Sequence, residues 1–149
     1  MNAAAILDHN RVILSHFDSY SAALVFARNG NSILSPAPLP ESASLIDAPD
    51  EMSAQHDPAA VMSALTAQLG LDPTLMASGK LSLDKEFDVW MSGENGPIRI
   101  HLARFSTPDA PREAIEPLGA VFKPISDMRG LPMTELNLLR QVFNLTLGS

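Results

Sequence analysis

The sequence predicts a single α+β domain, in which an antiparallel sheet of about four or five strands is covered on one face by two helices. Asn-Gly steps lie between apolar runs at Asn29-Gly30 and Asn95-Gly96, and this dipeptide is the strongest short-range signal for a β-hairpin. Two stretches near 58–69 and 132–147 carry apolar residues at helical spacing. The chain has 149 residues, of which 46% are hydrophobic, so residues 1–149 suffice for one buried core.

The N-terminal stretch 3–17 is expected to form a helix. Ile6, Val12 and Phe17 lie at spacings that partly suit a helical face, although Val12-Ile13-Leu14 alone suits a strand equally well.

The first hairpin is expected at 22–35, with its turn at Asn29-Gly30. A helix that ends at Gly30 is the alternative, because the alanines of this stretch favour a helix whereas Val25 and Phe26 favour a strand. The Asn-Gly step favours the hairpin, and the sequence leaves both strand and helix open for 22–28.

A surface loop is expected at about 35–56. Four prolines and several acidic residues fall in it, and proline removes the amide donors that a sheet needs. We interpret it as a solvated connector. The alternative is a segment that binds a partner through Leu39, Leu45 and Ile46.

Both long helices have clear boundaries. Asp57-Pro58 is typical of a helix start, and Gly70 is typical of a helix end. The last helix begins at Pro132 and carries two adjoining apolar stripes up to Leu147, so it is expected to be buried over most of its circumference, in the core or against a second subunit. Two further elements are expected between the second hairpin and the last helix: a short helix after Pro111 and an edge strand at 120–123.

The second hairpin, at about 86–106, is the most specific prediction. A two-residue turn at Asn95-Gly96 pairs strand residues as follows: Met91 with Ile100, Val89 with Leu102, Trp90 with His101, and Ser92 with Arg99. Continued further, this register turns Phe105 outward and Arg104 inward. Either a bulge after Leu102 corrects this, or the strand ends before Arg104.

The polar face of this hairpin supplies the candidate functional residues Asp88, Trp90, Arg99 and His101. A carboxylate near an imidazole orients it for acid–base chemistry, and an arginine holds an anionic group. An interaction surface, or an ordinary outward sheet face, is the simpler interpretation.

A second candidate is an anion site at Arg129 and Gly130, just before the helix that Pro132 opens; the simpler interpretation is a turn. No metal site is expected. In the predicted helix His9 and His16 lie about 10 Å apart along the axis, too far to share an ion. No cofactor is expected either, because no phosphate loop, dinucleotide fingerprint or nucleophile motif occurs.

Composition excludes several classes of protein. The chain has no cysteine, which rules out disulfides and cysteine nucleophiles and fits a cytoplasmic protein. Its formal net charge of −7 disfavours binding to nucleic acid. No segment has the roughly 20 apolar residues of a membrane span.

We therefore expect a non-enzymatic accessory or protein-interaction module, with a protein partner or a homodimer formed through the 132–147 helix. The alternative is a small enzyme or ligand-binding protein with a pocket around Trp90, His101 and Arg99.

Overall fold

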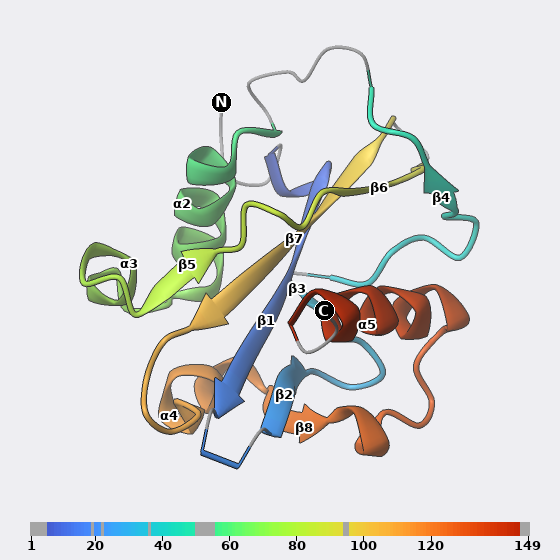
Figure 1. Ribbon diagram of the computed structural model, residues 1–149. Coiled ribbons are helices and arrows are strands. Elements are labelled where there is room, and N and C mark those ends of the chain that lie inside the picture. The colour runs from blue at the N-terminus through green and yellow to red at the C-terminus, as the bar shows by residue number, and fades with distance from the viewer. Residues whose placement is uncertain are drawn as a thin grey trace.

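The computed structural model describes residues 6–18, 20–21, 23–35, 37–49, 56–93 and 96–146. These residues form an eight-stranded sheet with the order β4-β6-β7-β1-β2-β8, in which β3 also pairs with β1 and β5 also pairs with β7 (Figure 1). The strands are β1 (Asn10–Asp18), β2 (Ala23–Arg28), β3 (Leu34–Ser35), β4 (Leu45–Ile46), β5 (Leu81–Leu83), β6 (Val89–Met91), β7 (Ile98–Phe105) and β8 (Val121–Pro124). The helical elements are α2 (Pro58–Leu69), α3 (Thr74–Ala77), α4 (Arg112–Ile115), η2 (Glu116–Leu118), η3 (Ile125–Asp127) and α5 (Met133–Thr146).

The centre of the sheet is a parallel pair of strands, β1 and β7. Their register runs without a break from Asn10 opposite Arg99 to His16 opposite Phe105. Parallel strands are normally buried on both faces and therefore carry apolar residues at successive positions. The run Val12-Ile13-Leu14 is such a sequence, and all three residues are buried. The helix predicted over 3–17 is therefore wrong over 10–17, which form a strand.

Helices cover both faces of the sheet (Figure 1). Leu138 and Val142 of α5 pack in one core with Ile13 and Ile100, whereas Leu65 of α2 packs in a second core on the opposite face. The predicted fold class is therefore wrong: the sheet is mixed, has more strands than the predicted four or five, and is covered on two faces. The physical reason is the long-range β1–β7 pairing, for which no local sequence pattern exists.

The outer neighbour of β1 is one strand broken into two pieces. Both β2 and β3 run antiparallel to β1. Between them the chain makes a tight turn in which Asn29 and Ser32 exchange two backbone hydrogen bonds of 2.9 and 3.1 Å, with Gly30 at a φ of 60°. The strand and turn predicted at 22–35 are present, but β3 resumes its course along β1 and does not fold back on β2 as a hairpin.

The hairpin predicted at 86–106 forms with a register displaced by two residues. Val89 lies opposite Ile100, and Trp90 lies opposite Arg99, where the sequence predicted Leu102 and His101. This register centres the turn one residue earlier than predicted, and the Gly96 backbone N–H donates to the Gly93 carbonyl at 3.4 Å. Residues 94–95 lie outside the described residues. A displacement of two residues preserves the faces of both strands, so Trp90 and His101 still share one face of the sheet.

No bulge follows Leu102, because the β1–β7 register is continuous through Arg104 and Phe105. Phe105 is 3% exposed in the core on the α2 side. Arg104 faces the other side, where Nη2 lies 2.9 Å from Asp84 Oδ2 and donates to Thr146 Oγ1 at 2.7 Å. The predicted register placed Phe105 on the outward face. That face is covered by α2, so Phe105 is buried without a bulge.

Other elements that the sequence predicted are present, whereas α3 and β5 were not predicted. The helix α2 has the expected bounds, α5 begins one residue after Pro132, and β8 is an edge strand that contains Pro124. The loop predicted at 35–56 contains β4, which forms the opposite edge of the sheet. Residues 36 and 50–55 of this loop lie outside the described residues.

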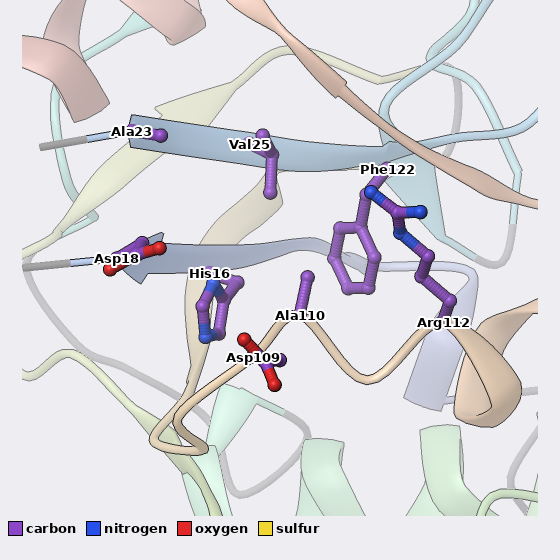
Figure 2. A pocket seen from close by; sticks show the side chains of 8 residues that line it. All are labelled: His16, Asp18, Ala23, Val25, Asp109, Ala110, Arg112 and Phe122. Carbon is purple, nitrogen blue, oxygen red and sulfur yellow. The ribbon is translucent and has the colours of Figure 1, made fainter. Parts of the chain in front are cut away.

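The sheet face that α2 covers is polar at both ends. Where β1 and β7 begin, Asn10 and His101 are buried. Where β1 ends, the buried His16 lines a cavity of about 450 Å³ (Figure 2). These two ends are the places on this face where polar chemistry is concentrated.

A buried carboxylate holds α5 against the break between β2 and β3. Glu135, which is 1% exposed, accepts hydrogen bonds from the Ile33 backbone N–H at 2.7 Å and from Ser32 Oγ at 2.9 Å. Burial raises the pKa of Glu135 above its ordinary value, although these two donors act in the opposite direction. The carboxylate thus supplies the acceptor that the interrupted strand does not have.

We expect Glu135→Ala to lower the free energy of unfolding by about 2 kcal/mol, because a buried backbone N–H then loses its acceptor. Urea unfolding measures the effect. Glu113→Ala, which removes an exposed acid from α4, is the control and should change stability by less than about 0.5 kcal/mol. Equal effects of the two substitutions would show that Glu135 does not stabilise the break.

Candidate functional site

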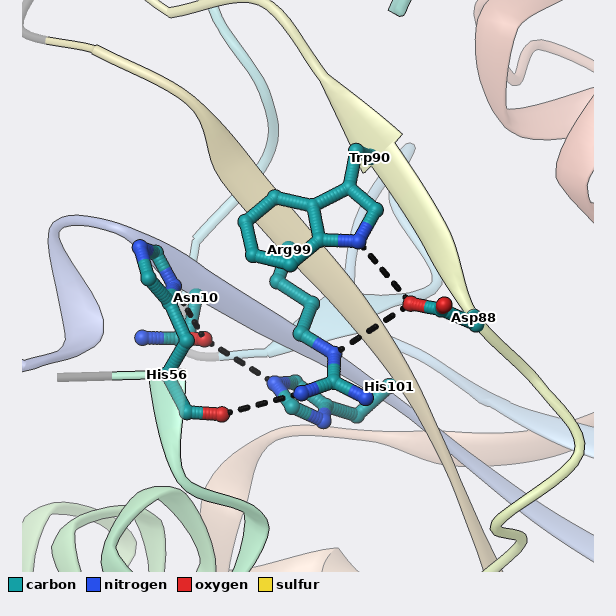
Figure 3. A network of polar contacts seen from close by, with 6 residues as sticks. All are labelled: Asn10, His56, Asp88, Trp90, Arg99 and His101. Atoms are coloured by element: carbon teal, nitrogen blue, oxygen red, sulfur yellow. Dashed lines mark hydrogen bonds and ion pairs between the residues drawn. The ribbon is translucent and has the colours of Figure 1, made fainter. Parts of the chain in front are cut away.

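The four candidate residues of the hairpin lie together (Figure 3). Asp88 Oδ1 accepts a hydrogen bond from Trp90 Nε1 at 2.9 Å and lies 3.7 Å from Arg99 Nε. The guanidinium carbon of Arg99 lies 5.6 Å from the centroid of the Trp90 ring, within the range of a cation–π interaction. His101 follows two residues later on the same strand and therefore on the same face.

Two further residues, which sequence reasoning missed, complete this network. Asn10 Oδ1 bonds His101 Nε2 at 2.9 Å and His56 Nδ1 at 3.2 Å. The sequence carries no local signal for these contacts, because Asn10 is 46 residues from His56 and 91 from His101. His56 is next to the start of α2, and Arg99 Nη1 donates to its backbone carbonyl at 3.1 Å.

The Asn10 amide determines which nitrogen of each imidazole carries the proton. Asn10 Nδ2 donates to the Ile6 carbonyl at 2.8 Å, so Oδ1 is the atom that faces the histidines. An amide oxygen only accepts, and therefore His56 Nδ1 and His101 Nε2 must both donate. In the neutral rings, the lone pairs lie on His56 Nε2 and His101 Nδ1.

Both imidazoles are held in the neutral form. Burial lowers the pKa of His101 to about 3, and the nearby Arg99 and His56 add to this effect. Burial likewise lowers the pKa of His56, with further contributions from His9 and Arg99. A buried cation beside Arg99 would be costly, which is why both rings are neutral near pH 7.

The network is closely packed. Trp90 and His101 are each 3% exposed, and the His56 ring packs edge-on against Trp90 with 4.8 Å between ring centroids. The larger cavities lined by described residues lie elsewhere. Asp88 is the member that reaches solvent, with 54% of its side chain exposed. The use of this surface for a partner or ligand stays a prediction.

The Arg129-Gly130 step forms a turn before α5. Gly130 has a φ of 88°, a conformation that favours glycine. The Arg129 carbonyl accepts a hydrogen bond from Arg28 Nη2, while Arg28 Nη1 donates to the Asp127 carbonyl at 3.0 Å. These contacts explain the turn without an anion, and anion binding at Arg129 stays a prediction.

An apolar groove lies on the outer side of α5. It has a volume of about 450 Å³ and is lined by Ile125, Leu136, Leu139, Arg140, Phe143 and Asn144. Phe143 is 42% exposed and Ile125 of η3 is 38% exposed. We call this surface the α5 groove. It is where one of the two apolar stripes that the sequence predicts on this helix reaches the surface.

No family model matches the chain, and no curated protein matches it. Within the described ranges, no helix is both long and apolar enough to span a bilayer. No group of three or more histidine, aspartate or glutamate side chains among these residues is arranged to hold a metal ion. The function must therefore be argued from the geometry.

The buried histidines should make the protein sensitive to acid. The unfolded chain takes up a proton at His101 near pH 6.5, but the folded chain does so only near pH 3. The free energy of unfolding should therefore fall by a few kcal/mol as the pH falls through this window, at about 1.4 kcal/mol per pKa unit. Urea unfolding at several pH values measures this slope.

We expect His101→Gln to flatten this slope, because glutamine retains a donor for Asn10 but does not titrate. The control is His9→Gln, which removes a partly exposed imidazole 6.2 Å from the His56 ring and should retain most of the slope. An unchanged slope in His101→Gln would show that this residue is not the buried neutral base.

Proposed function

We propose that the chain is a protein-interaction module that assembles with a second copy of itself through the α5 groove. The observation that carries this proposal is the groove itself, an apolar hollow of about 450 Å³ beside a partly exposed aromatic ring. An exposed apolar surface of this kind is typical of an interaction site.

The proposed occupant of the groove is the same groove of a second copy, which brings an identical apolar surface to the contact. A two-fold interface brings the same patch of both subunits together, so a projection on one must meet a hollow on the other. Phe143 and the hollow formed by Leu136 and Leu139 lie on the same helix. In the proposed dimer, each Phe143 ring packs against Leu136 and Leu139 of the second copy.

The charge around the groove also favours this contact. The chain carries a formal net charge of −7, so two copies repel each other over most of their surfaces. Among the described residues that line the groove, Arg140 is the charged one. The groove is thus a surface on which two acidic chains approach without placing carboxylates opposite each other.

Two parts of this proposal go beyond the groove. A non-enzymatic role in the cytoplasm rests on the cysteine-free sequence and the missing reaction motifs. The alternative, an enzyme or ligand-binding protein that uses Trp90, His101 and Arg99, is less well supported because these side chains pack against each other around no described cavity.

Multi-angle light scattering over a range of concentrations tests self-association. We expect a dimer that Phe143→Glu converts to a monomer, because the substitution places a carboxylate in an apolar contact. Asn144→Arg, at an exposed position on the rim, should weaken the dimer at least tenfold by filling the groove without removing an apolar side chain.

The matched control is Tyr20→Glu, which makes the same change from aromatic to acid at a residue that is 97% exposed and does not line the α5 groove. It should remain dimeric. Circular dichroism shows whether each variant is folded. A wild-type protein that is monomeric at every concentration, or a folded Phe143→Glu variant that still dimerises, would overturn the proposal.

A further inference from the structure

The cavity at the carboxyl end of β1, which we call the His16 cavity, lies on the opposite side of the sheet from the α5 groove. Its volume of about 450 Å³ is within the range of small-molecule sites, roughly 300–1,000 Å³. Val25, Ala110 and Phe122 form an apolar wall, and the Phe122 ring is fixed edge-on against Phe105 with 6.0 Å between centroids. The wall is therefore rigid and preformed.

A buried imidazole presents a free acceptor in this cavity. His16 is 2% exposed, and its Nε2 lies 2.7 Å from the Thr107 carbonyl oxygen. A carbonyl only accepts, so Nε2 carries the proton and Nδ1 of the neutral ring carries the lone pair. Among the described residues, Nδ1 has no hydrogen-bond partner. Nδ1 is not among the buried side-chain atoms that lack a partner, so it is accessible from the cavity, where a hydrogen-bond donor can reach it.

Two carboxylates lie at the same end of the cavity. Figure 2 shows the His16 ring between Asp18 and Asp109 in this view, and all three residues line the cavity. The backbone N–H groups of Tyr20 and Ser21 donate to Asp18 Oδ1 at 2.9 and 3.4 Å, which lowers the pKa of this carboxyl and keeps it anionic. This end therefore offers hydrogen-bond acceptors and negative charge, as a cation requires.

The other end of the cavity is basic. Arg112 of α4 lines it and lies beyond the Phe122 ring from the two carboxylates (Figure 2). A guanidinium offers only donors and binds carboxylates in a two-pronged arrangement. Opposite charges are thus separated by the apolar wall that Val25, Ala110 and Phe122 form.

We propose that the His16 cavity binds a small zwitterion, a molecule with an ammonium group at one end, a carboxylate at the other and an apolar segment between them. The ammonium donates to Asp18, Asp109 and Nδ1 of His16. The carboxylate accepts from Arg112, and the apolar segment packs against Phe122.

Isothermal titration calorimetry with four probes tests this proposal: 4-aminobutanoate, 6-aminohexanoate, hexylamine and hexanoate. We expect at least one of the two amino acids to bind. Hexylamine should bind more weakly because it has no carboxylate for Arg112. Hexanoate should not bind. Its carboxylate would either lie near those of Asp18 and Asp109 or, bound to Arg112, leave the acidic end without a cation.

Substitutions on the exposed rim separate the two ends of the site. Asp109→Asn should weaken both amine-bearing probes by about tenfold, the value expected for one charge-assisted hydrogen bond. Arg112→Gln should weaken the amino acid by a similar factor but leave hexylamine unchanged. The control is Glu113→Gln, which removes an exposed acid next to Arg112 that does not line the cavity, and it should change neither affinity.

Three outcomes would overturn the proposal. The first is that neither amino acid binds, and the second is that hexanoate binds as well as they do. The third is binding that Asp109→Asn and Arg112→Gln affect no more than Glu113→Gln does. None of these outcomes depends on self-association, because Phe143→Glu leaves the cavity intact and the titrations can be repeated on that monomeric variant.

Discussion

The parallel pairing of β1 with β7 is the interaction on which the rest of the structure depends. Parallel strands expose neither face to water without cost, since both faces of such strands are apolar. Helices must therefore cover both sides, and α2 and α5 do so from opposite faces. The antiparallel partners of β1 and β7 are both interrupted, so this central pair is also the longest unbroken ladder among the described residues.

Polar residues on these central strands are buried as a consequence and must be satisfied inside the protein. At one end of the α2-side face, Asn10 bonds one ring nitrogen of His56 and one of His101 and fixes their tautomers. At the other end, His16 likewise bonds Thr107 through one ring nitrogen. The two ends differ in packing: His56 and His101 pack closely around Trp90, whereas His16 lines a cavity of about 450 Å³ that has room for a ligand.

The two proposed sites lie on opposite faces of the sheet and rely on different interactions. Self-association through α5 relies on burial of apolar surface and on a patch that avoids the acidity of the rest of the chain. Ligand binding in the His16 cavity relies on that acidity, because carboxylates attract a cation. The sheet between the two sites gives each a rigid support, and neither site requires the other.

The sequence by itself determined the local elements. Pro58 opens α2, Gly70 ends it in the left-handed conformation, Pro132 precedes α5, and Pro124 lies in the edge strand β8. Proline and glycine act on the neighbouring backbone, so their effects can be read from the sequence. Alternation also placed Asp88, Trp90, Arg99 and His101 on one face, and this survived a register error of two residues because the side-chain period of a strand is two.

Only the tertiary structure decided that 10–17 is a strand, that the sheet is mixed, and that Asn10, His56 and His16 are the residues around which polar chemistry gathers. Contacts between residues 46 to 91 positions apart leave no trace in short-range periodicity. A strand buried on both faces does not alternate between apolar and polar residues, which is the pattern by which strands are recognised in a sequence.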